Sequence, residues 1–424
     1  MFVKTLTVVA GLVMLSVTVS GSEQGRGGAQ EPDPTEQMIR TLVSRLDFEE
    51  YKATIKGLTQ FGDRREGTER NRQAVDWIAA QLESYGCSPE RMTYEPPAPR
   101  GGGGGQRGRG GQRAGGQGQR GTPPPATMLE EPVRNSSGGS TLYGVRRRTG
   151  VNNSAEAQPS EALRELNSGP VLPGPIPQVY CTKVGTTRPD EMYIVGAHMD
   201  GIGYGEAAND DGSGTAIVML LAKVFSSPDV TTERSIRFAL WNGEEGGLRG
   251  ANAYVAARRD LQGREDPPGS GRYPEPKWLG MIQHDMMLWD HGMPRLDGTL
   301  APEQRPEADF NIEFQSNSQM VEASMQLALA VKLAADKYTT DYPGTVGPHM
   351  TNTDSTPFMD IVPAISLREN ERGMHTGAGW NPHWHQVTDL YSTFSDKDYK
   401  LGLNAGQATL AAVAQLAGAK IGQR

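Results

Sequence analysis

A chain of 424 residues is long enough to bury a substantial hydrophobic core. Its 50 acidic residues outnumber its 42 basic ones and give a formal net charge of −8. This balance argues against a general nucleic-acid binder and suits a soluble protein, which we expect to be a monomer. Beyond its N-terminal segment, the chain has no apolar stretch long enough to span a bilayer.

The N-terminus combines a lysine at position 4 with an apolar run that ends in small residues near position 20. This order is typical of a secretory signal peptide, which we predict over residues 1–21, followed by a flexible leader over 22–34. An uncleaved membrane anchor is the alternative, although glycine, serine and threonine interrupt the apolar run. The segment therefore predicts a secreted or periplasmic protein.

Helical periodicity follows the leader. Apolar side chains recur at helical spacing and predict helices over about 36–61 and 70–85, joined by the turn GDRREGTERN. A short strand is expected over 87–94. The helices and strand begin a single domain that we predict over 35–424.

A change of composition interrupts this domain. Residues 97–126 are rich in glycine, arginine and proline and contain no acidic or large apolar side chain. Such a segment cannot bury enough surface to offset the entropy of ordering, so we predict a disordered insertion over about 97–140. An arginine–glycine RNA-binding segment is the alternative, but predicted export and the absence of interleaved aromatic residues disfavour it.

Beyond the insertion, short β-rich runs alternate with helical runs. We predict helices over about 215–225, 318–338 and 396–416, and strands at QVYCTKV, EMYIVGAH, RSIRFALWNG, GMIQHDMML and PAISL. This alternation indicates an α/β fold with a mostly parallel, mixed central sheet and helices on both faces. The two cysteines, Cys87 and Cys181, flank the insertion, and both a disulfide and two free thiols remain open.

Acidic and imidazole side chains recur just after the predicted strands. They are His198 and Asp200, Asp210 and Asp211, Glu244 and Glu245, and Asp285. Because ligands bind outside the carboxyl ends of parallel strands, we expect these groups at one edge of the sheet. So many carboxylates would repel one another unless cations lay between them. Imidazole and carboxylate donors without thiolate favour zinc, with Mn²⁺ or Co²⁺ as alternatives.

These residues fall into five motifs that occur in a fixed order. The motifs are HMD (198–200), NDDGSG (209–214), EEGG (244–247), HDMM (284–287) and HQVTD (385–389). With them the chain resembles metallopeptidase family twenty-eight, the co-catalytic double-zinc aminopeptidases and carboxypeptidases. The resemblance covers about residues 35–95 and 175–415, and it implies the zinc-exopeptidase (phosphorylase/hydrolase-like) architecture.

The resemblance also implies two Zn²⁺ ions and their ligands. One ion would be bound by His198, Asp210 and Asp285. The other would be bound by Asp210, Glu245 and His385, so that Asp210 bridges the pair. His383 is an alternative to His385, which the spacing of the last motif favours.

Further roles carry over from the resemblance, with two departures from the family pattern. Asp200 would orient the imidazole of His198, and Glu244 would be the general base that takes a proton from a water bridging the metals and delivers it to the leaving amine. Trp384 stands where the aminopeptidases usually have a tyrosine, and Asp354 is what remains of a usual Ser-Asp-His stretch. We include Trp384 and Asp354 as candidates for contact with substrate.

The expected activity is that of a secreted zinc-dependent exopeptidase that acts on peptide substrates, with an aminopeptidase favoured. A carboxypeptidase of the same family is one alternative, for which Arg368 and Arg372 are candidate carboxylate-binding residues. A glutaminyl-cyclase-like transferase and a non-catalytic binding relative are the others. Taken singly, each motif has an ordinary explanation as a turn, a helix cap or a solvated loop. Their joint occurrence favours the metal site.

Overall fold

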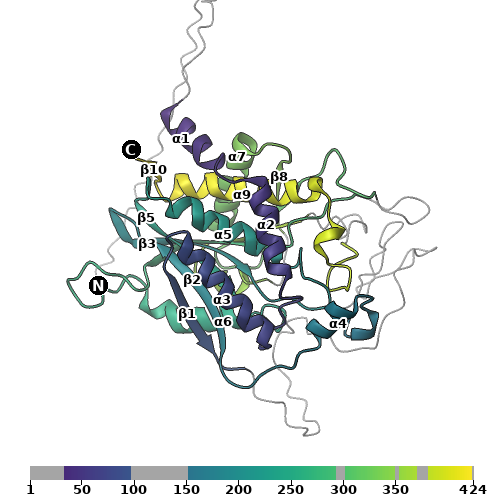
Figure 1. Cartoon of the computed structure of the whole chain (residues 1–424). Coiled ribbons are helices and arrows are strands. Elements are labelled where there is room, and N and C mark those ends of the chain that lie inside the picture. Colours follow the sequence, from purple (N-terminus) through teal and green to yellow (C-terminus); the bar gives the residue numbers. More distant parts are fainter. Residues whose placement is uncertain (1–32, 97–150, 293–300, 349–352, 370–380, 423–424) are drawn as a thin grey trace, which may run out of the picture.

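The computed structural model describes residues 33–96, 151–292, 301–348, 353–369 and 381–422 (Figure 1). The predicted signal peptide and insertion, and all but the last two residues of the predicted leader, lie outside the described residues.

The described residues form helices and strands that alternate along the chain. The helices are α1 (Pro34–Val43), α2 (Phe48–Thr59), α3 (Glu69–Ser84), α4 (Glu161–Asn167), α5 (Gly212–Ser226), α6 (Arg249–Arg258), α7 (Val321–Tyr338) and α9 (Asp396–Leu416). The strands are β1 (Pro89–Tyr94), β2 (Ile176–Lys183), β3 (Arg188–His198), β4 (Val230–Thr231), β5 (Arg234–Trp241), β6 (Lys277–Asp285), β7 (Phe310–Phe314), β8 (Gly344–Gly347), β9 (Ala364–Glu369) and β10 (Lys420–Ile421).

The central sheet has eight strands in the order β1-β2-β5-β3-β6-β9-β7-β8. Its middle strands β5, β3, β6 and β9 run parallel to their neighbours within that group. β2 joins β5, and β7 joins β9, in antiparallel register. The predicted mixed, mostly parallel sheet is confirmed, and its parallel centre brings four strand ends to one edge.

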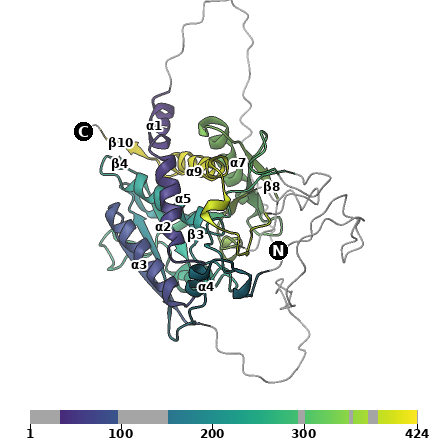
Figure 2. The same ribbon diagram turned by 45° about the vertical axis from the view of Figure 1, so that its right-hand side comes forward.

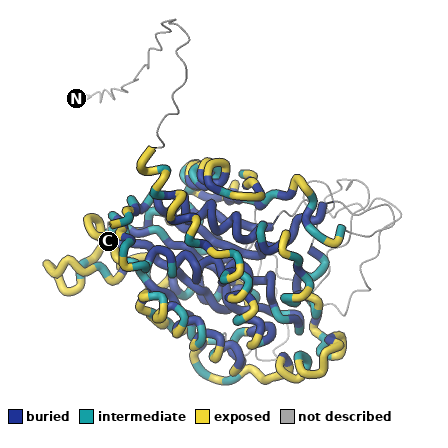
Figure 3. The backbone as a smooth tube through the Cα atoms, turned by 45° about the horizontal axis from the view of Figure 1, so that its top comes forward, coloured by how far each residue is buried: buried dark blue, intermediate teal, exposed yellow. Residues whose placement is uncertain are grey.

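Helices cover both faces of this sheet. Along β3, Val195 and Ala197 belong to a large core shared with α1, α2, α3, α5, α7 and α9, whereas Ile194 faces a smaller core. That second core contains Tyr254 of α6 and Phe358. α7 and α9 lie side by side (Figure 2), and the buried residues gather in the centre of the molecule (Figure 3).

The predicted single helix over 36–61 is wrong, because the chain forms α1 and α2 there with a break between them. Asp47 lies just before α2, and its side chain accepts a hydrogen bond from the backbone N–H of Glu50 at 2.8 Å. Such an N-cap satisfies a donor at the start of a helix and so favours a new helix at this point. The helical spacing of apolar residues on either side does not indicate this break.

A disulfide joins Cys87 to Cys181. The bond connects the residues just before β1 to β2, its antiparallel neighbour in the sheet. It encloses the predicted insertion within a loop whose ends are 94 residues apart in the sequence. Of the two alternatives that the sequence left open, the disulfide is the one found.

The buried side chain of His284 makes the stability of the fold depend on pH. It is fully buried near the end of β6, where its Nδ1 lies 3.3 Å from the carbonyl oxygen of Gly196 and its Nε2 lies 2.9 Å from the hydroxyl of Thr409. Burial lowers the pKa of His284 from 6.5 to about 4. The unfolded chain therefore takes up a proton at higher pH than the folded chain does.

We expect the contribution of His284 to the free energy of unfolding of the metal-free protein to fall by about 3 kcal/mol as the pH drops from about 6.5 to about 4. Urea unfolding of the wild type and of His284→Gln, which cannot titrate, would isolate this contribution as the difference between their pH dependences. Equal pH dependence in the two proteins would contradict the prediction.

None of the helices among the described residues is long and apolar enough to cross a membrane.

Candidate metal centre

The candidate site lies where the parallel strands end. β3 ends at His198, which pairs in register with Trp241, the last residue of β5. β6 ends at Asp285, which pairs with Arg368 of β9. The loop after β5 carries Glu244 and Glu245 to this same edge. The parallel register thus gathers side chains that are far apart in the sequence.

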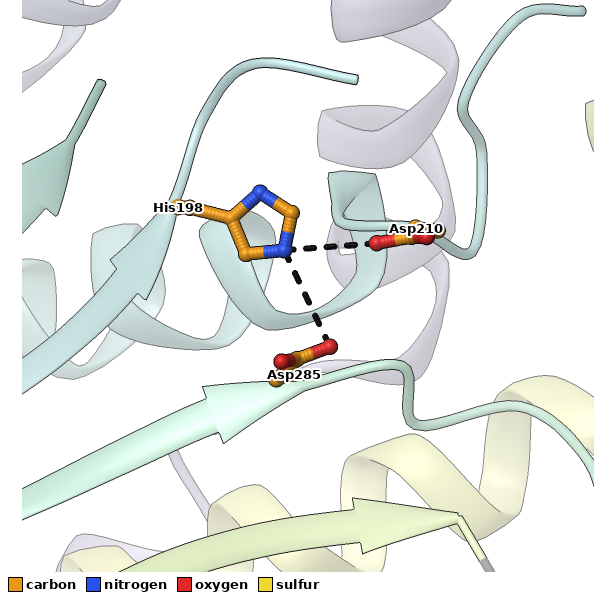
Figure 4. Close-up of side chains that lie close together, drawn as sticks. All are labelled: His198, Asp210 and Asp285. Atoms are coloured by element: carbon orange, nitrogen blue, oxygen red, sulfur yellow. Dashed lines mark ion pairs between the residues drawn. The ribbon is translucent and has the colours of Figure 1, made fainter. Parts of the chain in front are cut away.

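The first group of potential ligands comprises His198, Asp210 and Asp285 (Figure 4). His198 Nε2 lies 3.3 Å from Asp210 Oδ1 and 3.7 Å from Asp285 Oδ1. All three residues are buried, and their ligand atoms lie within 4.8 Å of one another. One ring nitrogen and two carboxylate oxygens therefore converge on a common point.

The second group comprises Asp210, Glu245 and His385. His385 Nε2 lies 2.9 Å from Asp210 Oδ2 and 2.8 Å from Glu245 Oε2. The two oxygens of Asp210 thus face different imidazoles. The structure brings together all five residues that the resemblance implied as ligands, in two groups that share Asp210.

Asp211, adjacent to the shared aspartate, organises the surrounding backbone. Its Oδ1 accepts a hydrogen bond from Gly214 N–H and thereby caps α5. The same oxygen accepts from Met286 N–H, and Oδ2 accepts from His198 N–H. One buried carboxylate therefore links the ends of β3 and β6 to the start of α5, so that neighbouring aspartates have different tasks.

Asp389 holds the shared aspartate from the other side. Its carboxylate accepts hydrogen bonds from the backbone N–H groups of Asn209 at 2.8 Å and Asp210 at 3.1 Å. Glu369 at the end of β9 accepts from the Asn209 side chain at 2.7 Å. Sequence reasoning used Asp389 only as a spacing marker and missed Glu369, which no recognised motif includes.

Asp200 contacts both His198 and Glu244, although differently from what was expected. Nδ1 of His198 lies 3.0 Å from the backbone oxygen of Asp200 and 3.8 Å from its carboxylate. The carboxylate instead accepts a hydrogen bond from the Glu244 N–H at 3.1 Å. Asp200 therefore orients the imidazole through its main chain and the loop that contains Glu244 through its side chain.

The carboxylates and imidazoles of the site shift one another's pKa values. Burial alone would raise the pKa of Asp210, but hydrogen bonds with His198 and His385 hold it below its usual range. Burial lowers the pKa of His385, but the carboxylates of Glu245 and Asp210 outweigh this effect and raise it to about 9. The cluster thus requires positive charge, which protonated imidazoles or bound cations can supply.

The residues present fit zinc. Two imidazole nitrogens and three carboxylates, without a thiolate, are donors that zinc accepts. Glu245 Oε1 is buried and accepts no hydrogen bond from any of the described residues. Because a buried carboxylate oxygen without a partner is costly, a cation at this position would stabilise it.

Glu244 lies beside these groups, and its N–H bond to Asp200 fixes its backbone. Burial raises the pKa of the Glu244 carboxyl well above its usual range, an effect that nearby His198 opposes and the Glu245 carboxylate reinforces. A carboxyl group that holds a proton readily suits a residue that accepts and returns one.

The remaining candidates differ in how they relate to the site. The ring of Trp384 stacks on His385 with centroids 3.8 Å apart, so it packs against a potential ligand. Asp354 is fully buried, and its Oδ1 has no hydrogen-bond partner among the described residues. Nδ1 of His383 lies 2.8 Å from the hydroxyl of Thr388, and His383 is in neither group of potential ligands. Arg372 lies outside the described residues.

The fold and site define an α/β protein with two adjoining groups of potential metal ligands at the carboxyl edge of its sheet. The chain belongs to Peptidase family M28, whose model matches residues 179–401, which confirms the resemblance seen in the motifs.

Curated relatives match a short stretch of the chain. Aminopeptidase YwaD from Bacillus subtilis is 40% identical over 68 residues, which are 16% of this chain and 14% of that protein. Aminopeptidase Y from Saccharomyces cerevisiae is 41% identical over 67 residues, 16% of this chain and 12% of that protein. The chain thus matches about one eighth to one seventh of the length of these relatives.

Solved structures match most of the chain. The Legionella pneumophila LapA aminopeptidase aligns with a TM-score of 0.55 and 14% identity, over 92% of this chain and 78% of that one. BSAP, a zinc aminopeptidase from Bacillus subtilis, gives 0.52 and 15%, over 88% and 95%. The Porphyromonas gingivalis glutaminyl cyclase gives 0.50 and 16%, over 87% and 98%. These identities show a shared fold, which alone does not separate a peptidase from a cyclase.

Proposed function

We propose that the protein is a secreted, zinc-dependent aminopeptidase that hydrolyses the N-terminal residue from peptides. The observation that carries the proposal is the pair of ligand groups sharing Asp210, with Glu244 beside them. The relatives named aminopeptidases, and the zinc aminopeptidase among the similar structures, support it.

In this proposal the side chains divide the work of hydrolysis. His198, Asp210, Asp285, Glu245 and His385 would hold two zinc ions. When bound, the ions would polarise the scissile carbonyl group and make water a stronger nucleophile at neutral pH. Mn²⁺ or Co²⁺ would suit the same donors.

Glu244 would be the general base. Its carboxylate would accept a proton from the attacking water and deliver it to the nitrogen of the leaving amine. The hydrogen bond from Glu244 N–H to Asp200 would keep the carboxyl group from drifting away from the reacting atoms. In this proposal the backbone hydrogen bond therefore sets the position of the base.

An excess of carboxylates favours a positively charged end of the substrate. Asp354, Asp200 and Glu244 are buried in addition to the potential ligands. Asp354 Oδ1, which lacks a hydrogen-bond partner among the described residues, could accept one from a free α-ammonium group. This charge balance favours recognition of the N-terminus.

A carboxypeptidase is the second candidate, because Arg368 lies at the site. Its Nη2 is 3.7 Å from Asp285 Oδ1, and the side chain is 8% exposed. A guanidinium group in this position could pair with the terminal carboxylate of a peptide. The N-terminus and the C-terminus of a peptide substrate therefore each have a candidate partner at the site. Which end of the substrate is cleaved distinguishes an aminopeptidase from a carboxypeptidase.

Paired peptides test the choice. One peptide would have a free N-terminus and the other an acetylated one, and each would be incubated with zinc or with a chelator. We expect zinc-dependent release of the first residue from the free peptide alone. Release from the C-terminus of the acetylated peptide would replace the proposal with a carboxypeptidase. Ammonia released from an N-terminal glutamine without peptide cleavage would indicate a cyclase, and no reaction with any substrate would favour a binding role.

Export is the second part of the proposal. The sequence pattern at the N-terminus predicts a signal peptide, and the Cys87–Cys181 disulfide fits an oxidising compartment. Fractionation of cells producing the full chain would locate it, and N-terminal sequencing of the product should show a start near residue 22. An intact N-terminus in the cytosol would contradict export.

A further inference from the structure

The segment Gly62–Asn71, which reads GDRREGTERN, contacts both loops that carry the candidate ligands. The pattern predicted only a turn there. Arg64 within it is completely buried, with a positive φ of 49°. A buried guanidinium is costly unless its donors are satisfied, so its partners indicate its role.

Arg64 binds the loop between His198 and Asp210. Its guanidinium group donates to the backbone oxygen of Met199 at 2.7 Å, of Glu206 at 2.9 Å and of Ala207 at 2.8 Å. These three carbonyl groups span most of the loop. Arg64 therefore cross-links the chain that leaves β3 to the chain that arrives at Asp210.

Glu66, two residues later, lies against the loop that contains Glu244 and Glu245 and binds residues beside that loop. Tyr94 donates a hydrogen bond to Glu66 Oε1 at 2.7 Å, and Arg249 at the start of α6 pairs with Glu66 Oε2. This cluster of Glu66, Tyr94 and Arg249 lies directly against the loop.

The glycines on either side of the two glutamates show how close this contact is. A Cβ atom on Gly243 would lie 2.4 Å from both Glu66 Oε1 and the Tyr94 hydroxyl. A Cβ atom on Gly246 would lie 2.8 Å from Glu66 Oε2. Both distances are far shorter than van der Waals contact, so Glu66 would have to move away if either position carried a side chain.

Asn71 completes the attachment. Its side chain exchanges two hydrogen bonds with that of Asn242, at 3.0 and 2.9 Å, and it also donates to the Arg64 backbone oxygen at 2.8 Å. Asn242 in turn accepts from the N–H of Gly243. The segment is thus hydrogen-bonded to one loop through Arg64 and to the other through Asn71. Glu66 packs against that second loop and pairs with Arg249, the first residue of α6.

We propose that Gly62–Asn71 is a positioning clamp that holds the two ligand-bearing loops in register, with Arg64 setting the His198–Asp210 loop and Glu66 setting the Glu244–Glu245 loop. The proposal deepens the proposed function and rests on its metal centre. Among the described residues, the side-chain hydrogen bonds and ion pairs of Arg64 and Glu66 do not reach the side chains of the potential ligands. They act through the backbone, and residues that orient metal ligands in this way commonly change affinity or activity by about 10- to 100-fold.

Two substitutions separate the halves of the clamp. Glu66→Gln keeps the size of the side chain but removes the ion pair with Arg249, and Arg64→Lys cannot reach three carbonyl groups at once. The neighbours Glu69 and Arg65 are exposed, so Glu69→Gln and Arg65→Lys are matched controls. Calorimetric titration of each metal-free protein with zinc would give the number of sites and their affinities.

The two variants should behave differently. Glu66→Gln should weaken one zinc site by about 10- to 100-fold, because its loop supplies a ligand to only one group. Arg64→Lys should weaken both, because Asp210 belongs to both groups. The controls should bind zinc as the wild type does. In kinetics, Glu66→Gln should lower kcat with little change in KM, since Glu244 also moves.

Thermal unfolding of the metal-free proteins distinguishes positioning from simple loss of stability. Zinc affinities that equal those of the wild type, measured well below the unfolding temperature, would overturn the clamp even if the variants unfold earlier. If Glu66→Gln does not fold, Tyr94→Phe removes only the hydroxyl donor and should weaken the same single site to a smaller degree. An unchanged site in Tyr94→Phe would then overturn the role of Glu66.

Together with the activity assay, the zinc titration tests the clamp independently of the proposed aminopeptidase activity. A wild-type protein that binds two zinc ions but releases no amino acid would disprove the aminopeptidase, while the predicted pattern in the variants would still establish the clamp. An active wild type whose variants bind zinc normally would disprove the clamp alone.

Discussion

Replacing Glu244 with glutamine should lower kcat by about 100- to 10,000-fold, the range typical of a lost general base. The amide cannot accept the proton from the attacking water. Because Glu244 belongs to neither ligand group, the variant should keep its zinc. Measurement of amino-acid release together with zinc content would test both expectations.

The adjacent glutamate provides the matched comparison. Glu245 Oε2 lies 2.8 Å from His385 Nε2, and Glu245 is one of the potential ligands. Glu245→Gln should therefore lose zinc as well as activity, and added zinc should restore part of the activity. A Glu244→Gln variant that lost zinc while Glu245→Gln kept it would reverse the two roles.

The second large effect is expected at Asp210, the residue that both ligand groups share. Asp210→Asn removes the negative charge that faces both His198 and His385 and leaves one oxygen as a donor to metal. We expect zinc to bind far more weakly at both sites, by more than the roughly 100-fold reached by residues that only orient ligands. Zinc titration of the metal-free variant would measure the loss, and activity should fall with it.

Asp211, one residue further, is the control for this substitution. Asp211→Asn retains one oxygen to accept from Gly214 and Met286, but its amide nitrogen cannot accept from His198 N–H. This change should cost stability, about 1–3 kcal/mol for a buried donor left unpaired, while two zinc sites remain. Urea unfolding and zinc titration of both variants would show the contrast. Loss of zinc in Asp211→Asn alone would contradict the assignment.

Three of the candidate ligands could be placed from the sequence because they end or closely follow an easily recognised strand. His198 and Asp285 end β3 and β6, and Glu245 follows β5. The runs of apolar residues in these strands are strong local signals, and parallel pairing then forces their carboxyl ends to one edge. His385 is not at a strand end, and only the spacing of its motif indicated it.

Helical periodicity predicted the wrong helix boundaries where a single capping side chain begins a new helix. The break between α1 and α2 depends on Asp47 as an N-cap, within a pattern that reads as one helix. The sequence also does not show that the main chain of Asp200, rather than its carboxylate, lies within hydrogen-bond distance of the His198 ring. Such choices depend on backbone geometry that the residue types do not specify.

The sequence by itself therefore determined the α/β class, the family and the residues that form the candidate metal centre, because periodicity and motif order are local properties of the chain. Only the tertiary structure decided that Asp210 faces two imidazoles and that Cys87 pairs with Cys181. It alone brought Arg64 to Met199 and Glu66 to Arg249, which lie more than a hundred residues away from them in the sequence. Contacts of that range follow from how the loops pack, which neither propensity nor spacing encodes.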